Sequence, residues 1–160
     1  CNGFQALVKL GLVPFGDIRP MDKDCPTLTF NGIGRHQSRL VRTRVCSDLS
    51  PWLSKCEVGD VHTVAVSHGE GRFVAPDAVL ASMVESGQVC TQYVDDNGRP
   101  SMDLSVNPNG SLLAIEGICS PDGRVMGKMG HTERSGSGLY KNVGGNLFQP
   151  LIEGGVAYFA

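Results

Sequence analysis

The chain has 160 residues, of which 41% are hydrophobic and 19% charged, and its 14 basic and 16 acidic side chains give a formal net charge of −2. This length allows one domain with a substantial core and is too short for two. The near balance of charge argues against a nucleic-acid binder that works by neutralising phosphates, and no apolar run approaches the ~18 residues of a membrane-spanning helix.

Six cysteines stand at positions 1, 25, 46, 56, 90 and 119. No two of them have C-x-x-C spacing, so a structural zinc site has little support. A chain of this size and apolar content folds without disulfides, and we therefore expect free thiols in a reducing compartment, the cytoplasm. Because the sequence begins at Cys1 and not at a methionine, it predicts a processed protein or part of a longer one.

The first predicted element is a short helix over residues 4–12. Phe4 and Val8 belong to an apolar stripe with helical spacing, and Gly11 is placed to end the helix. Cys1 would then lie just before the helix N-terminus. The helix dipole and the free N–H groups of the first turn would favour a thiolate at that position.

The rest of the chain alternates strand and helix patterns. Period-two alternation predicts strands at 27–30, 39–45, 60–66 and 88–94. Residues 112–118 and 124–129 resemble a hairpin joined by a turn at 120–123. Helices are predicted at 76–83, with a proline near the N-terminus, and at 146–158. This interleaving predicts the α/β class.

An arginine-rich stretch covers residues 35–44, where four arginines stand beside His36. It has two interpretations from the sequence alone. It is the solvent-facing side of an edge strand, or it is a basic seam that docks an acidic partner domain or ligand.

Cys1 and His131 are the candidates for catalysis. Cys1 precedes Asn2 and Gly3 at the head of a helix, which is typical of a nucleophile elbow, although the strand that should precede the elbow is not in the sequence. His131 and Glu133 are two residues apart, so on an extended segment their side chains point the same way. Glu133 could hold one imidazole nitrogen while the other faces a thiol. The alternatives are a buried structural cysteine and a surface histidine beside a salt-bridging glutamate.

Four motifs, in this order and spacing, resemble a known family: CNGFQ at 1–5, HGEGRF at 68–73, NPNGS at 107–111 and MGHTER at 129–134. They are similar to the glutaminase domains of phosphoribosylformylglycinamidine synthases, which are triad-type (class I) glutamine amidotransferases. The block GICSPDGRV at 117–125 most resembles the large single-chain form, in which this domain is C-terminal.

The resemblance implies a three-layer, flavodoxin-like α/β fold of the class I glutamine amidotransferase type, here lacking its N-terminal strands. Residues 1–160 would form a single domain that is the C-terminal portion of a glutamine amidotransferase domain. The implied catalytic residues are Cys1 as nucleophile, His131 as general acid and base, and Glu133 as the residue that orients His131. Thr132 stands where the family usually has a proline.

The resemblance also implies the residues that bind the substrate glutamine. The backbone N–H of Asn2 would supply half of the oxyanion hole, and Gln5 falls where the family has a glutamine near the substrate. The loop that begins at His68 and Gly69 would line the glutamine pocket.

The implied reaction is hydrolysis of glutamine through a cysteine thioester. The ammonia would pass to a synthetase domain, on the same chain or another, for the ATP-dependent conversion of formylglycinamide ribonucleotide to formylglycinamidine ribonucleotide in purine biosynthesis. ATP and Mg would belong to that domain, so no cofactor, metal, nucleic acid or membrane partner is expected here. With half an oxyanion hole, the isolated 160-residue piece is expected to have little or no glutaminase activity.

Two other functions remain open from the sequence. Cys1 could be an N-terminal nucleophile that uses its own α-amine as base, as in self-processed hydrolases, which would make His131 unnecessary. Alternatively, the chain could be a non-catalytic docking module of a synthetase, with the arginine-rich stretch as its contact surface.

Overall fold

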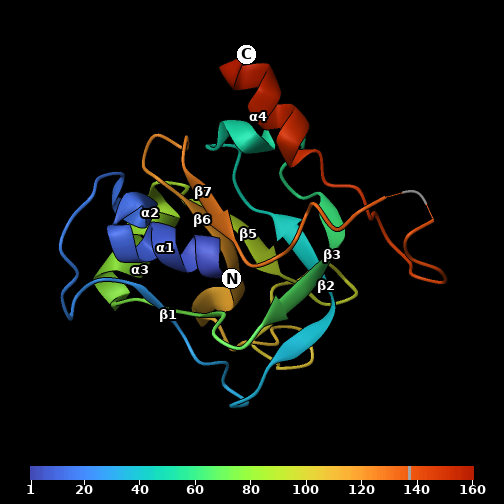
Figure 1. Cartoon of the computed structure of the whole chain (residues 1–160), viewed down its shortest axis with the longest axis horizontal. Coiled ribbons are helices and arrows are strands. Elements are labelled where there is room, and N and C mark those ends of the chain that lie inside the picture. The colour runs from blue at the N-terminus through green and yellow to red at the C-terminus, as the bar shows by residue number, and fades with distance from the viewer. Residues whose placement is uncertain (137) are drawn as a thin grey trace.

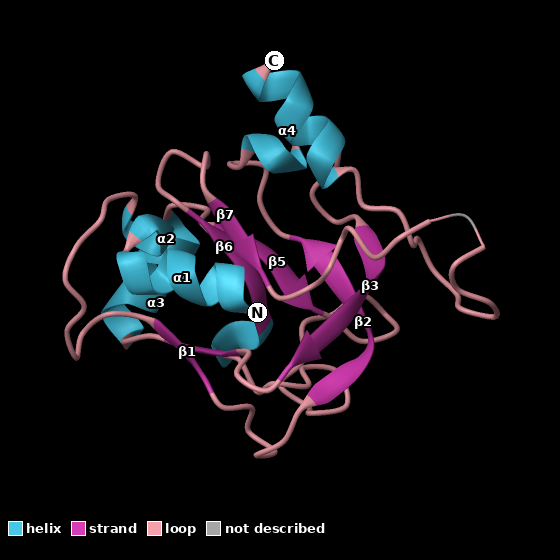
Figure 2. Cartoon of the chain, in the orientation of Figure 1, coloured by secondary structure: helices cyan, strands magenta, loops and turns pink. Residues whose placement is uncertain are grey.

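The computed structural model describes residues 1–136 and 138–160 (Figure 1). Its helices are α1 (Asn2–Leu10), α2 (Leu12–Phe15), α3 (Asp77–Glu85) and α4 (Leu151–Phe159), with 3-10 turns η1 (Pro51–Leu53) and η2 (Leu112–Ala114). Its strands are β1 (Thr27–Thr29), β2 (Gln37–Val45), β3 (Val61–His68), β4 (Arg72–Val74), β5 (Val89–Tyr93), β6 (Ile115–Cys119) and β7 (Met126–Lys128). The interleaved helices and strands confirm the predicted α/β class (Figure 2).

A curled antiparallel sheet of five strands, in the order β3-β2-β5-β6-β7, forms the centre of the molecule. Strands β1 and β4 pair separately as a second, two-stranded sheet. Helices α1, α2 and α3 gather on one side of the larger sheet, whereas α4 packs on η1 at the far end of the molecule (Figure 1). The predicted hairpin is present as the β6–β7 pair.

Helix α1 forms for the reasons that the sequence indicated. Phe4 and Val8, one turn apart, are buried in the largest apolar cluster together with side chains of α3 and β6. Gly11 ends the helix with φ 84°, a conformation that glycine adopts without steric cost, and its N–H bonds the carbonyl of Val8. Phe4 packs directly on Gly127 of β7, where a side chain would collide with the ring. This contact fixes the start of α1 over β7.

The arginine-rich stretch lies mostly on β2, which one of its two interpretations placed at a sheet edge. That prediction is wrong, because β2 pairs with β3 along its length and with β5 at its C-terminal end. The guanidinium groups of Arg39, Arg42 and Arg44 bond the chain's own loop, at the carbonyl of Ser105, the carboxylate of Asp96 and the carbonyl of Gly98. These three arginines therefore bind the segment at 96–105 of the same chain.

Two predicted boundaries moved. The strand expected from residue 112 begins only at Ile115, because residues 112–114 form η2. The C-terminal helix begins at Leu151 and not at 146, since Pro150 directly precedes it and prolines favour the start of a helix. Trp52 packs on α4, with its ring against Gly155 and 5.6 Å from that of Phe159.

The six cysteines are all free thiols, as predicted. Across the described part of the chain, every helix is too short or too polar to cross a lipid bilayer.

Candidate active site

Cys1 stands at the N-cap of α1, half-buried at the margin of the largest apolar cluster. Its thiol donates a long hydrogen bond, 3.9 Å, to the carbonyl of Glu70 in the loop between β3 and β4. The first amides of a helix have no partner within the helix, so the start of α1 presents N–H groups and the positive end of the helix dipole beside this sulfur. A thiolate at Cys1 would be stabilised there.

Gln5 ties α1 to the same loop. Its side-chain Nε2 donates to the Glu70 carboxylate at 3.0 Å and to the Glu70 carbonyl at 3.4 Å. The thiol of Cys1 and the amide of Gln5 therefore approach one residue of the loop from one turn of helix. Cys1 and Gln5, which were both predicted to lie at the site, therefore contact the same residue, Glu70.

His68 holds this loop from inside. Only 1% of it is exposed, and its Nδ1 lies 3.0 Å from Asn31 Oδ1, which also accepts the N–H of Gly71. Burial, followed by the charge of the nearby Cys1 amino group, lowers the pKa of His68 to about 4, so the imidazole is neutral at pH 7. The loop that begins at His68 was expected to line the glutamine pocket, and the buried side chain of His68 supports the backbone of that loop.

Gly71 is required by close contacts. A Cβ at this position would come within 2.7 Å of both His68 Nδ1 and Met129 Cε, so a larger residue would displace the loop or the end of β7. Gly69, by contrast, has open space around it, and its carbonyl accepts the N–H of Asn31. Gly69 can therefore border a pocket, whereas Gly71 is part of the packing.

Buried polar side chains of the NPNGS motif hydrogen-bond the end of the loop at 68–73. Asn109 donates to the carbonyl of Gly71 at 2.6 Å, and the Ser111 hydroxyl accepts the N–H of Phe73 at 3.0 Å. Asn107 holds Ser111 in turn, by accepting its N–H at 3.1 Å. Asn107, Asn109 and Ser111 are all fully buried. The sequence showed a turn at this motif and gave no sign that its side chains reach the loop after β3.

His131 follows β7 and lies beside β3, with its N–H bonded to the carbonyl of Ala65 at 2.8 Å. Its Nδ1 lies 2.7 Å from Glu133 Oε1, so the predicted contact is present, although residues 131–134 form a turn and not the extended segment that was expected. Desolvation raises the pKa of Glu133, but the hydrogen bond with His131, a backbone hydrogen bond and the charges of His131 and Arg134 together outweigh it and lower that pKa. Glu133 is thus held as a carboxylate against one imidazole nitrogen.

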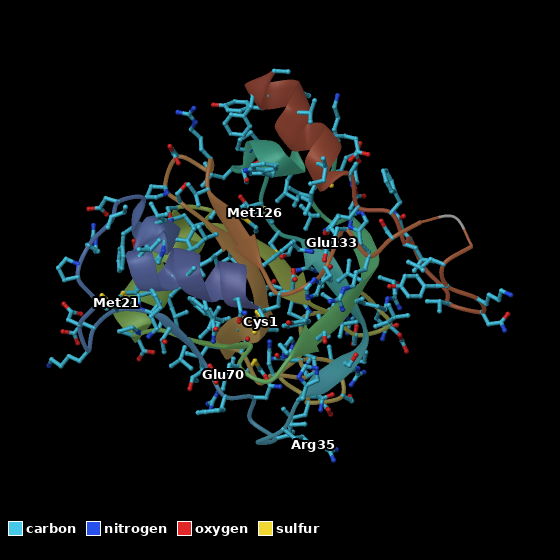
Figure 3. All side chains as sticks on the ribbon, in the orientation of Figure 1. Cys1, Met21, Arg35, Glu70, Met126 and Glu133 are labelled. Atoms are coloured by element: carbon cyan, nitrogen blue, oxygen red, sulfur yellow. The ribbon has the colours of Figure 1, made fainter. Side chains whose placement is uncertain are left out.

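The turn at 131–134 and the start of α1 lie on the same side of the molecule. Burial lowers the pKa of the Cys1 amino group, the carboxylates of Glu133 and Glu116 act against this change, and Arg134 adds to it. Figure 3 shows Cys1 between Glu70 and Glu133. In this structure the thiol contacts Glu70 and the imidazole contacts Glu133.

Asn2 is the first residue of α1, and its side chain is exposed. Its backbone N–H belongs to the first turn, where helical amides have no partner within the helix. That amide is therefore available to donate a hydrogen bond to a negatively charged oxygen beside Cys1.

One group among the described residues has the composition of a metal site. Ligand atoms of Cys56, Asp60 and His62 lie within 4.8 Å of one another where β3 begins, at the opposite end of the strand from His68. Burial and the Asp60 charge raise the pKa of Cys56 to about 11, and the Asp60 carboxylate already accepts the N–H of Glu57. We therefore assign no ion to this group, and His62 is a buried residue of β3.

Comparisons with known proteins agree along nearly the whole chain. A family model described as a CobB/CobQ-like glutamine amidotransferase domain matches residues 1–151. The phosphoribosylformylglycinamidine synthase subunit PurQ of Aquifex aeolicus is 37% identical over 135 residues, which are 84% of this chain and 54% of that protein. The same subunit of Gloeobacter violaceus is 37% identical over 158 residues, 98% of this chain and 62% of that protein.

A solved structure of PurLQS from Thermotoga maritima is similar with a TM-score of 0.69 and 26% identity, over 99% of this chain and 59% of that chain. The chain described here thus spans between a half and two thirds of the length of the proteins that it matches.

Proposed function

This chain belongs to the family of CobB/CobQ-like glutamine amidotransferase domains, and we propose that it carries the catalytic cysteine, histidine and glutamate of a phosphoribosylformylglycinamidine synthase glutaminase. Its fold is of the class I glutamine amidotransferase type, as the sequence predicted. The observation that carries the proposal is the hydrogen-bonded pair of His131 and Glu133, which lies on the same side of the molecule as the thiol of Cys1 (Figure 3).

Cys1 is the nucleophile in this proposal. Its thiol proton passes to His131, and the thiolate attacks the side-chain carboxamide carbon of glutamine, forming a carbon–sulfur bond and a negatively charged oxygen. The N–H of Asn2 donates to that oxygen, and one such donor is typically worth about 3 kcal/mol in the transition state. The start of α1 favours both the thiolate and the oxyanion because its amides and dipole attract negative charge.

His131 moves the protons. Its Nδ1 is engaged by Glu133, which leaves Nε2 to take the thiol proton and to give it to the departing ammonia as the carbon–nitrogen bond breaks. The product is a glutamyl thioester. His131 then accepts a proton from water, the resulting hydroxide attacks the thioester, and glutamate leaves with the thiol restored.

Gln5, Gly69 and the loop that starts at His68 are proposed to border the glutamine site. Gln5 lies one helical turn from Cys1 and bonds the same loop residue as the thiol does. Gly69 leaves open space in which a substrate can approach. His68 acts through the loop, since it is buried and bonded to Asn31.

The ammonia is proposed to serve a synthetase domain, in cis or in trans, that holds ATP and Mg and makes formylglycinamidine ribonucleotide. This rests on the names of the relatives, because the site around Cys1 accounts for glutamine hydrolysis alone. A cytoplasmic location fits a purine-biosynthesis enzyme with free thiols.

The test is glutamine hydrolysis by the full-length protein that contains this sequence, measured as glutamate released. The proposal expects activity in the wild type, none in Cys1→Ser, and a loss of most of the rate in His131→Ala. Survival of the rate in His131→Ala would instead support a nucleophile that uses its own amine as base. Absence of any Cys1-dependent hydrolysis, with the synthetase substrates present, would support a docking module without catalysis.

A further inference from the structure

A fully buried carboxylate lies beneath the turn that carries His131. Glu116 is on β6, where every residue is buried, and none of its own surface is exposed. One carboxylate oxygen accepts the hydroxyl of Thr91, and the other accepts the N–H of Gly130 and lies 3.7 Å from Lys128 Nζ. A buried charge is costly unless it is paired and hydrogen-bonded, and here both oxygens have partners.

Gly130 directly precedes His131. By accepting the N–H of Gly130, Glu116 holds the backbone that positions the imidazole of His131. A Cβ at Gly130 would come within 2.9 Å of Glu116 Oε1 and 2.8 Å of Val64 Cγ2, which only glycine avoids. The next amide, that of His131, is bonded to the carbonyl of Ala65. Two successive N–H groups are thus held by groups from two different strands.

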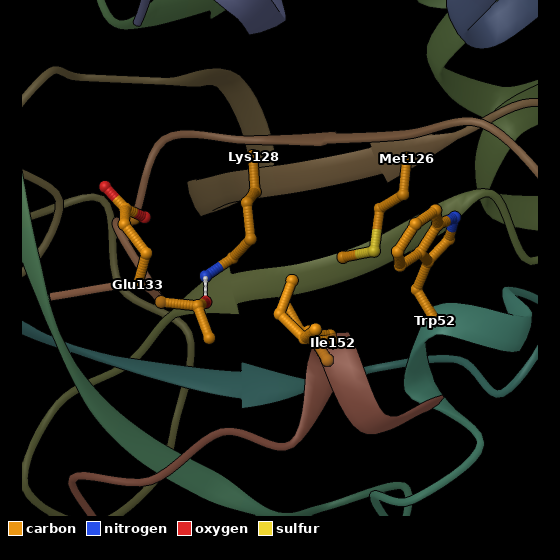
Figure 4. A pocket seen from close by; sticks show the side chains of 8 residues that line it. Trp52, Met126, Lys128, Glu133 and Ile152 are labelled. Carbon is orange, nitrogen blue, oxygen red and sulfur yellow. Dashed lines mark hydrogen bonds between the residues drawn. The ribbon is translucent and has the colours of Figure 1, made fainter. Parts of the chain in front are cut away.

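Lys128 extends this network to the other side of His131. Its ammonium group donates to Thr132 Oγ1 at 3.1 Å and to Gln149 Oε1 at 2.9 Å, and the Thr132 hydroxyl donates to the same Gln149 oxygen at 2.8 Å. Figure 4 shows Lys128 reaching from β7 into a pocket bordered by Glu133 and Trp52. Thr132 lies between His131 and Glu133. Glu116 and Lys128 together therefore contact the residue before His131 and the residue after it.

We propose that Glu116 and Lys128 are positioning residues for glutamine hydrolysis, which assumes the function proposed above for Cys1 and His131. Their ion pair holds the amide of Gly130 before His131 and the hydroxyl of Thr132 after it, and so keeps Nδ1 of His131 on Glu133 and its Nε2 free for the thiol. Replacing such a buried pair by apolar residues is often neutral for stability or even favourable. A role in stability alone therefore gives little reason for an ion pair at this place, whereas an error of about 1 Å in a catalytic group can cost about 100-fold in rate.

The test compares Glu116→Gln, Lys128→Met and the double variant in the full-length protein. Lys128→Met leaves the Glu116 charge buried without its cation, so both stability and rate should fall, with kcat for glutamine hydrolysis down about 100-fold. Glu116→Gln keeps an acceptor for Gly130 and should lower kcat about 10-fold. In both variants KM for glutamine should stay within about threefold, because neither residue reaches the substrate.

The double variant separates positioning from stability. Removing both charges should restore the melting temperature toward that of the wild type, while kcat stays at least about 10-fold low. Recovery of kcat together with the melting temperature would overturn the proposal. Glu85→Gln, which neutralises an exposed glutamate on α3, is the control and should change neither quantity.

A crystal structure of the double variant gives a readout that does not depend on turnover. The proposal expects the distance from His131 Nδ1 to Glu133 Oε1, 2.7 Å here, to lengthen beyond hydrogen-bonding range or the imidazole to occupy a second rotamer. An unchanged pair would overturn the positioning role even if the wild type hydrolysed no glutamine. A wild type without glutaminase activity but with a displaced pair in the variant would overturn the proposed function alone.

Discussion

The two segments that face Cys1 are held by different chemistry. The loop at 68–73 rests on neutral groups, the amides of Asn31 and Asn109, whereas the turn at 129–134 rests on the ion pair of Glu116 and Lys128. Neutral amides fix a shape with little dependence on charge. A buried ion pair holds its geometry only while both partners are charged. The loop expected to bind substrate is therefore held by neutral hydrogen bonds, whereas the turn expected to move protons is held by an ion pair.

The largest effect should come from removing the group that the charged network holds. His131→Ala in the full-length protein should lower kcat for glutamine hydrolysis by roughly 10²- to 10⁴-fold, the usual contribution of a general acid and base. The melting temperature should change little, because the His131 side chain is partly exposed and lies outside the apolar clusters. Steady-state glutamate release measures the change in kcat, and thermal unfolding measures the change in melting temperature. Comparable losses in both would mean that His131 has a structural role.

Removing a hydrogen bond from the neutral network under the loop at 68–73 should instead affect stability and KM more than kcat. Asn109→Ala removes the donor to the Gly71 carbonyl and to the Tyr93 hydroxyl, and an unsatisfied buried group costs about 1–3 kcal/mol. Unfolding by urea should report that loss, and KM for glutamine should rise more than kcat falls, because the loop at 68–73 is expected to line the pocket. Asn97→Ala, at an exposed turn, is the matched control. A fall in kcat without a change in KM would contradict this division between loop and turn.

Lowering the pH should also affect the loop at 68–73 and the turn at 129–134 differently. The unfolded chain binds a proton at His68 near pH 6.5, whereas the folded chain resists it until about pH 4. Stability should therefore fall as pH drops through this window, by about 3 kcal/mol in total. His68→Gln should flatten that slope in the free energy of unfolding. The stabilisation from Glu133, whose pKa is lowered, is present above the ordinary carboxyl pKa of 4.5 and is lost only below it.

The smallest effect is expected at the outer end of the charged network. Gln149→Ala removes one acceptor from Lys128 and one from Thr132, while Glu116 continues to hold Lys128. We expect a loss of about 0.5–1.5 kcal/mol in unfolding free energy and only a few-fold change in kcat. Gln149→Glu, which keeps an acceptor at this place, should retain more of the activity. Equal losses in the two variants would show that volume, and not hydrogen bonding, matters there.

Much of this site could be predicted from local sequence. The apolar spacing of Phe4 and Val8 with Gly11 predicts α1 and so the place of Cys1, and the two-residue spacing predicts the contact between His131 and Glu133. The helix prediction succeeds because helix periodicity is decided by near neighbours. The contact between His131 and Glu133 forms although residues 131–134 are a turn, in which the N–H of Arg134 bonds the His131 carbonyl, and not the extended segment that was expected.

The supporting networks could not be predicted in this way. Glu116 stands within an apolar run, and nothing local in the sequence shows that it is fully buried, with its carboxylate satisfied by Thr91, Gly130 and Lys128 from distant segments. Asn109 reads as a turn residue, although its amide crosses to the loop after β3. The edge position expected for β2 failed for the same reason, since strand order depends on pairings between distant segments.

The most direct test of the central claim is labelling of the full-length protein with a diazo-ketone analogue of glutamine, followed by mass spectrometry of its peptides. Cys1 should carry a single adduct, glutamine should protect it, and thiols such as Cys56 and Cys90, whose pKa values are raised, should remain unmodified. Labelling spread over several of the cysteines, or none at Cys1, would contradict the account.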